Sequence, residues 1–230
     1  ILETEFLKMQ ALKKSLFIIG STGLVGKHLV TQALERGYHV KALARNPSAL
    51  NVTNDNLEVI KGDVGDLEIL EKHFAGCEAI LSTLGAPSPT EGFPTIRTEG
   101  AKNVIQACKK TGVKRFLVVC GGSMLRVDDM NRYFEFPGMP EWLVKVTEDY
   151  KGVWEALVAS DLEWTMYCPP KMNEGEKTGK VIITNDEVPC DRSEMMKITL
   201  MGADLASIML DELVNRDYIK TFVGCCNEAQ

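Results

Sequence analysis

An apolar run followed at once by three evenly spaced glycines constrains the fold more than any other feature of this chain. Residues Leu16–Ile19 predict a buried strand, Gly20–Gly26 (GSTGLVG) a tight turn, and the amphipathic stretch ending near Arg36 a helix. Glycine permits a tight turn and a close approach of backbone to ligand, and the free N–H groups at a helix start attract anions. The pattern therefore predicts a strand, turn and helix that hold a pyrophosphate.

The residue that ends the second strand bears on which dinucleotide this turn would hold. The glycine spacing is G-x-x-G-x-x-G rather than G-x-G-x-x-G, so it has to be weighed together with the strand that comes after the helix. The stretch Tyr38–Ala44 predicts this second strand, and Arg45 comes directly after it, with no Asp or Glu at the tip to bind a ribose hydroxyl. An arginine there suits a 2′-phosphate. We therefore expect NADPH or NADP rather than NAD(H).

Strand and helix patterns alternate along the rest of the chain. We expect further strands at 57–61, 79–84, 113–120 and 162–168, and helices at 66–75, 98–111 and 141–159. This alternation predicts right-handed βαβ units and an α/β fold, a Rossmann-like doubly wound parallel sheet. Strands at 181–183 and 219–223 and a helix at 202–214 are expected as smaller pieces beyond the sheet's carboxyl edge, a small C-terminal extension of a single domain.

The composition of the chain limits which binding partners and which cellular compartment we expect for the protein. The formal charge of −6 argues against nucleic acid, because its recognition rests on clustered Lys and Arg. Seven cysteines without a C-x-x-C pair fit reduced thiols, and no apolar run approaches the ~20 residues that cross a bilayer. We expect a cytoplasmic protein with a small-molecule substrate, as a monomer or weak dimer, and without a metal, nucleic-acid or membrane partner.

The beginning of the chain carries no recognisable pattern. Residues 1–8 precede Met9, and we expect them to be a cloning remnant or disordered, with Met9 as the natural start. Residues 9–230 would then form one NAD(P)-binding Rossmann domain, with the elements of the substrate pocket supplied by residues 121–230.

Several short pieces spread along nearly the whole chain match one family. They are Gly20–Gly26, Arg45–Ser48, Gly62–Val64, Leu84-Gly85, Glu99–Asn103, Cys120, Val146–Tyr150 and Pro169-Pro170. On these pieces the chain resembles the atypical short-chain dehydrogenase/reductases with an NAD(P)-binding domain, and within them the NADPH-dependent flavin reductase (biliverdin-IXβ reductase) branch. Most pieces are common to the wider superfamily, whereas Val146–Tyr150 and the double proline are more particular to that branch.

The resemblance implies roles for individual residues. Gly20, Thr22, Gly23, Leu24 and Val25 would wrap the pyrophosphate, Arg45 and Ser48 would hold the 2′-phosphate, Asp63 and Val64 the adenine, and Leu84 and Gly85 would lie beside the ribose and nicotinamide. Cys120, Pro170 and Met172 would line the nicotinamide end, together with Tyr150 and Lys171. The chain departs from the family at Ala49, where a second arginine is common, at Gly122, where the relative has a serine, and at Tyr150 and Lys171, where it has histidines.

Proton chemistry has to be judged from the residues themselves. Dehydrogenases of the superfamily use a Tyr-x-x-x-Lys pair, in which the lysine lowers the pKa of the tyrosine. Aligning the helix that precedes Ser160 puts Lys151 at the lysine position and Thr147 at the tyrosine position. A threonine hydroxyl does not titrate near neutral pH, so alcohol and carbonyl chemistry by that route is disfavoured.

The candidate catalytic residues are therefore Tyr150, Ser123 and Lys171. Tyr150 would stack on the substrate or give it a proton, Lys171 would neutralise an acidic group of the substrate, and Ser123 would hydrogen-bond to it. The alternatives are a ring on the helix surface, a solvated loop charge and a cap of the local backbone.

Two functions of different classes fit these residues. Hydride transfer to an electron-poor conjugated acceptor, a biliverdin-type tetrapyrrole or a flavin such as FMN as substrate rather than bound cofactor, asks little acid catalysis of the protein. The alternative is a non-catalytic NADP(H)-sensing protein like the NmrA-type regulators. An epimerase-like or isoflavone-reductase-like enzyme is weakened by the missing tyrosine. The long loop Arg126–Pro140 is expected to be a lid, with a dimer contact or a disordered surface loop as alternatives.

Overall fold

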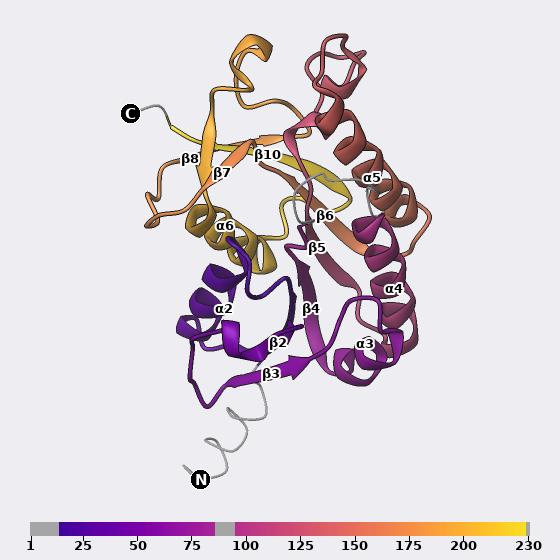
Figure 1. Cartoon of the computed structure of the whole chain (residues 1–230), viewed down its shortest axis with the longest axis vertical. Coiled ribbons are helices and arrows are strands. Elements are labelled where there is room, and N and C mark those ends of the chain that lie inside the picture. Colours follow the sequence, from indigo (N-terminus) through magenta and orange to yellow (C-terminus); the bar gives the residue numbers. More distant parts are fainter. Residues whose placement is uncertain (1–13, 86–94, 229–230) are drawn as a thin grey trace.

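The chain folds around one large sheet covered by helices on both faces (Figure 1). The structure, a computed structural model, describes residues 14–85 and 95–228. Its main sheet has eight strands in the order β3-β2-β1-β4-β5-β6-β10-β8, and every neighbouring pair is parallel except β10 and β8. The predicted Rossmann-like doubly wound α/β fold is confirmed. Residues 1–8, expected to be a remnant or disordered, lie outside the described residues.

The strands begin and end close to where the apolar runs predicted. From one edge of the sheet to the other they are β3 (Leu57–Lys61), β2 (His39–Ala44), β1 (Ser15–Ile19), β4 (Cys77–Ser82), β5 (Arg115–Val119), β6 (Glu163–Cys168), β10 (Thr221–Asn227) and β8 (Val181–Asn185). All five residues of β5 are buried, as a central strand between two helical layers requires. The strand order reverses between β1 and β4, which is where ligands bind in open sheets of this kind.

The helices divide into two layers that carry separate apolar cores. Helices α2 (Gly26–Glu35) and α6 (Gly202–Asn215) pack on one face, and α3 (Leu67–Phe74), α4 (Ile96–Thr111) and α5 (Glu141–Val158) cover the other (Figure 1). A short parallel pair, β7 (Lys171–Asn173) and β9 (Thr199–Met201), lies apart from the main sheet. Among the residues that the structure describes, none of the helices combines the length and hydropathy that a bilayer crossing needs.

The last third of the chain is more closely integrated than the sequence pattern predicted. We expected its strands as small pieces beyond the carboxyl edge, but β10 pairs with β6 inside the main sheet, and β8 closes the edge antiparallel to β10. The reason lies in β10 itself, where Phe222 to Cys226 are all buried, so the strand has apolar side chains for both faces of the sheet.

A buried carboxylate joins α5 to the first turn of α4. Asp149 Oδ1 accepts a hydrogen bond from the backbone N–H of Thr98 at 2.9 Å, and Oδ2 accepts one from Arg97 N–H at 3.3 Å. These N–H groups would otherwise lack partners at the helix start. The two helices touch closely here, because a Cβ on Gly152 would lie 2.4 Å from the Thr98 hydroxyl oxygen. The Asp149 carboxylate therefore fixes α4 against α5.

A buried ion pair connects the sheet to α6. Arg115 of β5 lies 2.7 Å from Glu212 of α6, and their side chains are 4% and 2% exposed. Glu212 also accepts hydrogen bonds from the backbone N–H groups of Asp217 and Tyr218 at 3.1 and 3.0 Å. With these extra donors, the carboxylate is fully engaged in a place that water does not reach.

Removal of this carboxylate should destabilise the fold. Glu212→Ala leaves the Arg115 guanidinium buried without its counter-charge, so the free energy of unfolding should fall by about 3 kcal/mol in a urea titration. The matched control is Asp161→Ala, which breaks the exposed pair with Lys114 and should barely move the unfolding midpoint. Equal effects of the two variants would contradict a structural role for the buried pair.

Candidate functional site

The turn after β1 leaves no room for side chains. Gly20 has φ +77°, and a Cβ on it would lie 2.9 Å from the carbonyl oxygen of Thr83. A Cβ on Gly26 would lie 2.0 Å from the carbonyl oxygen of Gly20, and that same oxygen accepts the hydrogen bond from Gly23 N–H at 2.9 Å. Because glycine alone fits these positions, the turn presents bare backbone.

The start of α2 offers donors that the protein does not use. The helix has neither a side-chain cap at Val25 nor an acidic residue in its first turn. Within the described ranges, the N–H groups of Leu24, Val25 and Gly26 have no backbone acceptor. Free N–H groups and the positive end of the helix dipole favour a phosphate at this point. The donor set therefore fits the predicted pyrophosphate.

A cleft of about 400 Å³ adjoins this turn, and we call it the glycine cleft. Most of the predicted cofactor residues line it: Gly20, Thr22, Gly23, Leu24, Val25, Arg45, Asp63, Val64, Leu84, Gly85 and Met172. Ser48 does not, and its hydroxyl donates to Asn46 Oδ1 at 2.8 Å. The ends of β1 to β4 thus bring residues far apart in sequence to one cleft, while their individual contacts with a dinucleotide stay predictions.

A second cavity of about 360 Å³, the inner pocket, shares Met172 with the glycine cleft. It receives the remaining predicted residues: Cys120, Ser123, Tyr150, Pro170 and Lys171. Sequence reasoning missed the apolar side chains that complete it, namely Trp142, Leu143 and Val146 from α5 and Met195 and Met196 from the segment before β9. No motif marks these residues, because any apolar side chain of suitable size could occupy such a wall.

The Ser123 hydroxyl is committed to the protein. Thr147 Oγ1 donates its proton to the carbonyl oxygen of Leu143 at 2.7 Å. In the 2.8 Å contact between the two hydroxyls, Ser123 must therefore be the donor. Ser123 is buried, at 4% exposure, and it retains lone pairs but no proton for a substrate. Its predicted hydrogen bond to substrate is thereby restricted to that of an acceptor.

Tyr150 lies in the wall of the inner pocket with a cation behind it. Its ring packs on Gly121, where a Cβ would lie 2.9 Å from Tyr150 Cε2. The Arg97 guanidinium lies 5.1 Å from the ring centroid and pairs with Asp149 at 3.2 Å. Burial raises the pKa of Tyr150 to about 12, although Arg97 opposes the shift. The phenol therefore stays protonated at neutral pH, and Arg97, which no sequence signal indicated, helps to hold the ring.

Cys120 of the inner pocket and its neighbour Cys168 are both buried. Cys120 Sγ lies 2.8 Å from Cys168 Sγ, at the ends of the adjacent strands β5 and β6. Both are free thiols, and burial raises the pKa of Cys168 well above its ordinary value. The Cys168 thiol therefore stays protonated and is a poor nucleophile. Cys120 is 4% exposed and lies in the wall of the inner pocket.

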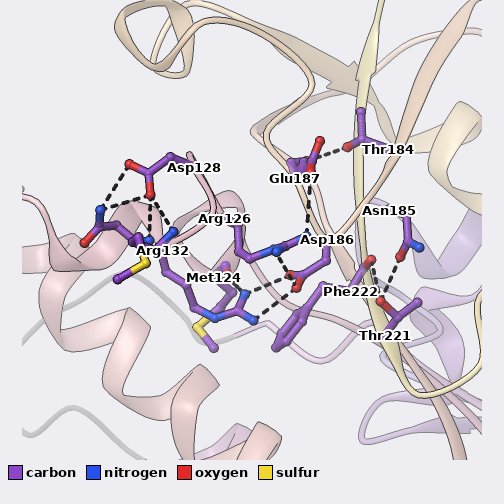
Figure 2. Close-up of polar contacts among 12 residues, drawn as sticks. Met124, Arg126, Asp128, Arg132, Thr184, Asn185, Asp186, Glu187, Thr221 and Phe222 are labelled. Carbon is purple, nitrogen blue, oxygen red and sulfur yellow. Dashed lines mark hydrogen bonds and ion pairs between the residues drawn. The ribbon is translucent and has the colours of Figure 1, made fainter.

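The loop expected to be a lid is fixed at its base, as Figure 2 shows. Arg132 Nη1 and Nη2 donate to Asp186 Oδ1 and Oδ2 at 2.8 and 3.1 Å, and Nη1 also donates to the carbonyl oxygen of Met124. Arg126 Nε adds an ion pair to Asp186 at 3.2 Å. Such bidentate pairing fixes both partners. The adjoining Tyr133 is thereby held in the wall of the inner pocket, while closure of the rest of the loop stays a prediction.

Substitution in the turn tests the close approach of the backbone. Gly20→Ala should lower the melting temperature and abolish dinucleotide uptake in calorimetry, because its Cβ meets the Thr83 backbone. Gly37→Ala is the matched control, since Gly37 also has a positive φ, +82°, but no atom within 4 Å of the added Cβ. Gly37→Ala should therefore be milder and should keep binding. Loss of binding in both variants would contradict a specific cradle at Gly20.

Two known proteins are similar to this chain along nearly its whole length. The uncharacterised protein YwnB of Bacillus subtilis is 26% identical over 218 residues, which cover 93% of this chain and 98% of that protein. The solved structure of a "putative NADH-flavin reductase" from Streptococcus pneumoniae is 25% identical and matches with a TM-score of 0.79, covering 94% of this chain and all of that one.

Matches to larger enzymes are partial. The 3-beta-hydroxysteroid dehydrogenase of Mycolicibacterium neoaurum is 31% identical over 118 residues, which cover 47% of this chain and 32% of that protein. This match is confined to about a third of a longer enzyme. A family model described as NAD(P)H-binding, in contrast, matches residues 20–215, which include the turn, the inner pocket and all of the glycine cleft except Ile19. The chain therefore belongs to the NAD(P)H-binding family of Rossmann-fold proteins.

Proposed function

We propose that this protein is an NADPH-dependent reductase that transfers hydride to a conjugated acceptor, such as a flavin or a biliverdin-type tetrapyrrole. One observation carries the proposal: the glycine cleft and an inner pocket with largely apolar walls share Met172. A dinucleotide in the cleft would present its reactive end toward that pocket. The likeness to the structure of a "putative NADH-flavin reductase" from Streptococcus pneumoniae supports a flavin as the acceptor, although that name gives NADH as the nucleotide.

The residues of the glycine cleft account for a dinucleotide with a 2′-phosphate. The bare turn at Gly20 and the free N–H groups of α2 suit the pyrophosphate. Arg45 lies exposed at the end of β2 and has no carboxylate partner among the described residues. Its guanidinium is thus free to donate to a phosphate in a bidentate manner.

The Ser123 and Tyr150 hydroxyls of the inner pocket do not give up a proton easily. Ser123 donates to Thr147, Thr147 donates to Leu143, and Tyr150 has a pKa of about 12. A bound nicotinamide would supply the hydride itself, and a conjugated acceptor can take its proton from solvent. The part left to the protein is to orient a planar acceptor between Tyr150 and the methionines and to exclude water.

The weak acidity of these two hydroxyls also fits a second candidate function, that of a non-catalytic NADP(H)-sensing protein of the NmrA type. In that case the inner pocket would bind no acceptor, and a protein partner would recognise whether the bound dinucleotide is oxidised or reduced. Tight NADP(H) binding without turnover, together with a stable partner in a pull-down from its own source, would favour this function. Turnover with a small acceptor would exclude it.

A panel of acceptors tests the proposal directly. Purified protein mixed with NADPH and either FMN, riboflavin or a biliverdin should oxidise the nicotinamide faster than the mixture without protein, as followed by absorbance. Heat-denatured protein is the control. If none of these acceptors accelerates the oxidation, the proposed reductase function is wrong.

Arg45 should set the preference between the two nucleotides. Arg45→Ala should weaken NADPH binding by about 2 kcal/mol, because a charge-assisted phosphate contact is lost, and should leave NADH binding nearly unchanged. Calorimetry with both nucleotides on the same variant supplies the control within one experiment. Equal losses for NADPH and NADH would contradict the 2′-phosphate contact.

The Tyr150 phenol should not act as the acid. Since its pKa is about 12, Tyr150 stays protonated from about pH 6 to about pH 9, and the rate with a flavin should show no step from it in that range. Tyr150→Phe should keep kcat, whereas Tyr150→Ala, which removes the ring, should raise KM. A drop in kcat of about 100-fold in Tyr150→Phe would instead identify the phenol as a general acid.

A further inference from the structure

A third cavity extends the inner pocket outward. It has a volume of about 660 Å³, and we call it the outer hollow. It shares Tyr133 and Met196 with the inner pocket, and Phe136 and Met139 of the expected lid loop form another part of its wall. Pro137, Gly138 and Pro140 of the same loop also line it, and the short helix η4 (Arg192–Glu194) contributes Arg192 and Ser193. The outer hollow therefore combines apolar sides with one cation.

Arg192, the cation of the outer hollow, has no carboxylate partner among the described residues. The described residues 14–85 and 95–228 include all eight arginines of the chain, and six of them form ion pairs with carboxylates. The two without such a partner in these ranges are Arg45, at the glycine cleft, and Arg192, at the outer hollow. In a chain with a net charge of −6, a cation left unpaired beside a cavity is a candidate for binding an anion.

The surroundings of Arg192 keep its charge available. Glu194, two residues along, pairs with Lys197 at 2.9 Å, and Asp191 forms no ion pair with Arg192. The Arg192 guanidinium lies 3.6 Å from the centroid of the Phe136 ring. Stacking on an aromatic face holds the guanidinium plane and leaves its N–H groups along the edge free to bind a planar or tetrahedral anion.

One chain segment links this cation to the reaction pocket. Arg192 lines the outer hollow, Met195 lines the inner pocket, and Met196 lines both. A single ligand can therefore place its planar part against Met195 and Tyr150 and extend a tail past Met196 toward Arg192. Lys171, at the inner pocket, is the competing cation for a ligand with a shorter reach.

We propose that Arg192 binds the anionic tail of the acceptor, so that the conjugated head lies in the inner pocket and a terminal phosphate monoester or carboxylate lies in the outer hollow. The inference rests on the proposed function and narrows its acceptor class to amphipathic molecules with a planar head and an anionic end. FMN has this form, and riboflavin is the same molecule without the phosphate.

The test compares these two flavins in binding and in turnover. Binding to the NADP⁺-loaded protein is followed by flavin fluorescence, and NADPH oxidation is measured in parallel. FMN should bind about tenfold more tightly than riboflavin, as expected for one charge-assisted contact, and Arg192→Gln should bring the two affinities together by weakening FMN binding alone. Lys197→Gln is the matched control, because it removes one positive charge from the same segment but lines neither cavity.

Two further arms identify the anion and the cation involved. Inorganic phosphate should compete with FMN and leave riboflavin binding unchanged, if the phosphate group is what Arg192 recognises. Lys171→Gln should keep the preference for FMN. If the preference is lost in Lys171→Gln and kept in Arg192→Gln, the inference is overturned in favour of the inner cation.

The outcomes separate this inference from the function on which it rests. Reduction of both flavins with an unchanged FMN preference in Arg192→Gln would overturn the role of Arg192 and leave the reductase function intact. Arg192-dependent binding of FMN without NADPH oxidation by any acceptor would support the role and refute the reductase function. If neither flavin binds the NADP⁺-loaded protein, the role of Arg192 in binding FMN is overturned and flavins are excluded as acceptors.

Discussion

The first turn of the sheet brings two stretches of backbone into direct contact, and the remaining architecture depends on that contact. Gly20 takes a left-handed conformation beside Thr83, and Gly26 lies against the Gly20 carbonyl. Only with both glycines can β1 pass into α2 with its N–H groups uncovered. The strand order reverses beside this turn, so the ends of four strands converge on one cleft.

Charge distribution separates the positions that hold the fold from those left for ligands. Most arginines form ion pairs with carboxylates of the protein, as in the buried pair Arg115–Glu212 and in the Arg132–Asp186 contact at the base of the long loop. A guanidinium in such a pair has fewer N–H groups and less net charge to offer to a second anion. Arg45 and Arg192 have no such pair among the described residues, and each lies at a cavity. Arg192 and Arg45 therefore share the two features that suit an anion site, an unpaired guanidinium and a place at the wall of a cavity.

The sequence predicted local elements well because their signals are local. The glycine turn, Arg45 and the apolar central strands depend on neighbouring residues. The cofactor residues predicted between Gly20 and Gly85, apart from Ser48, do line one cleft. Position across the sheet was harder, since β10 finds its place through burial on both faces rather than through any motif. Arg97 and Met195 reach the site from α4 and from the segment before β9, and their residue types alone do not distinguish them from ordinary surface or core residues.

The link between α4 and α5 has a consequence for how the two cavities respond to their contents. Ile96, in the wall of the glycine cleft, directly precedes Arg97, and Tyr150, in the wall of the inner pocket, directly follows Asp149. The Asp149 carboxylate and the close approach at Gly152 join α4 to α5, the two helices that carry Ile96 and Tyr150. The glycine cleft and the inner pocket therefore share one structural support, and a shift of the joined helices α4 and α5 would alter the walls of both.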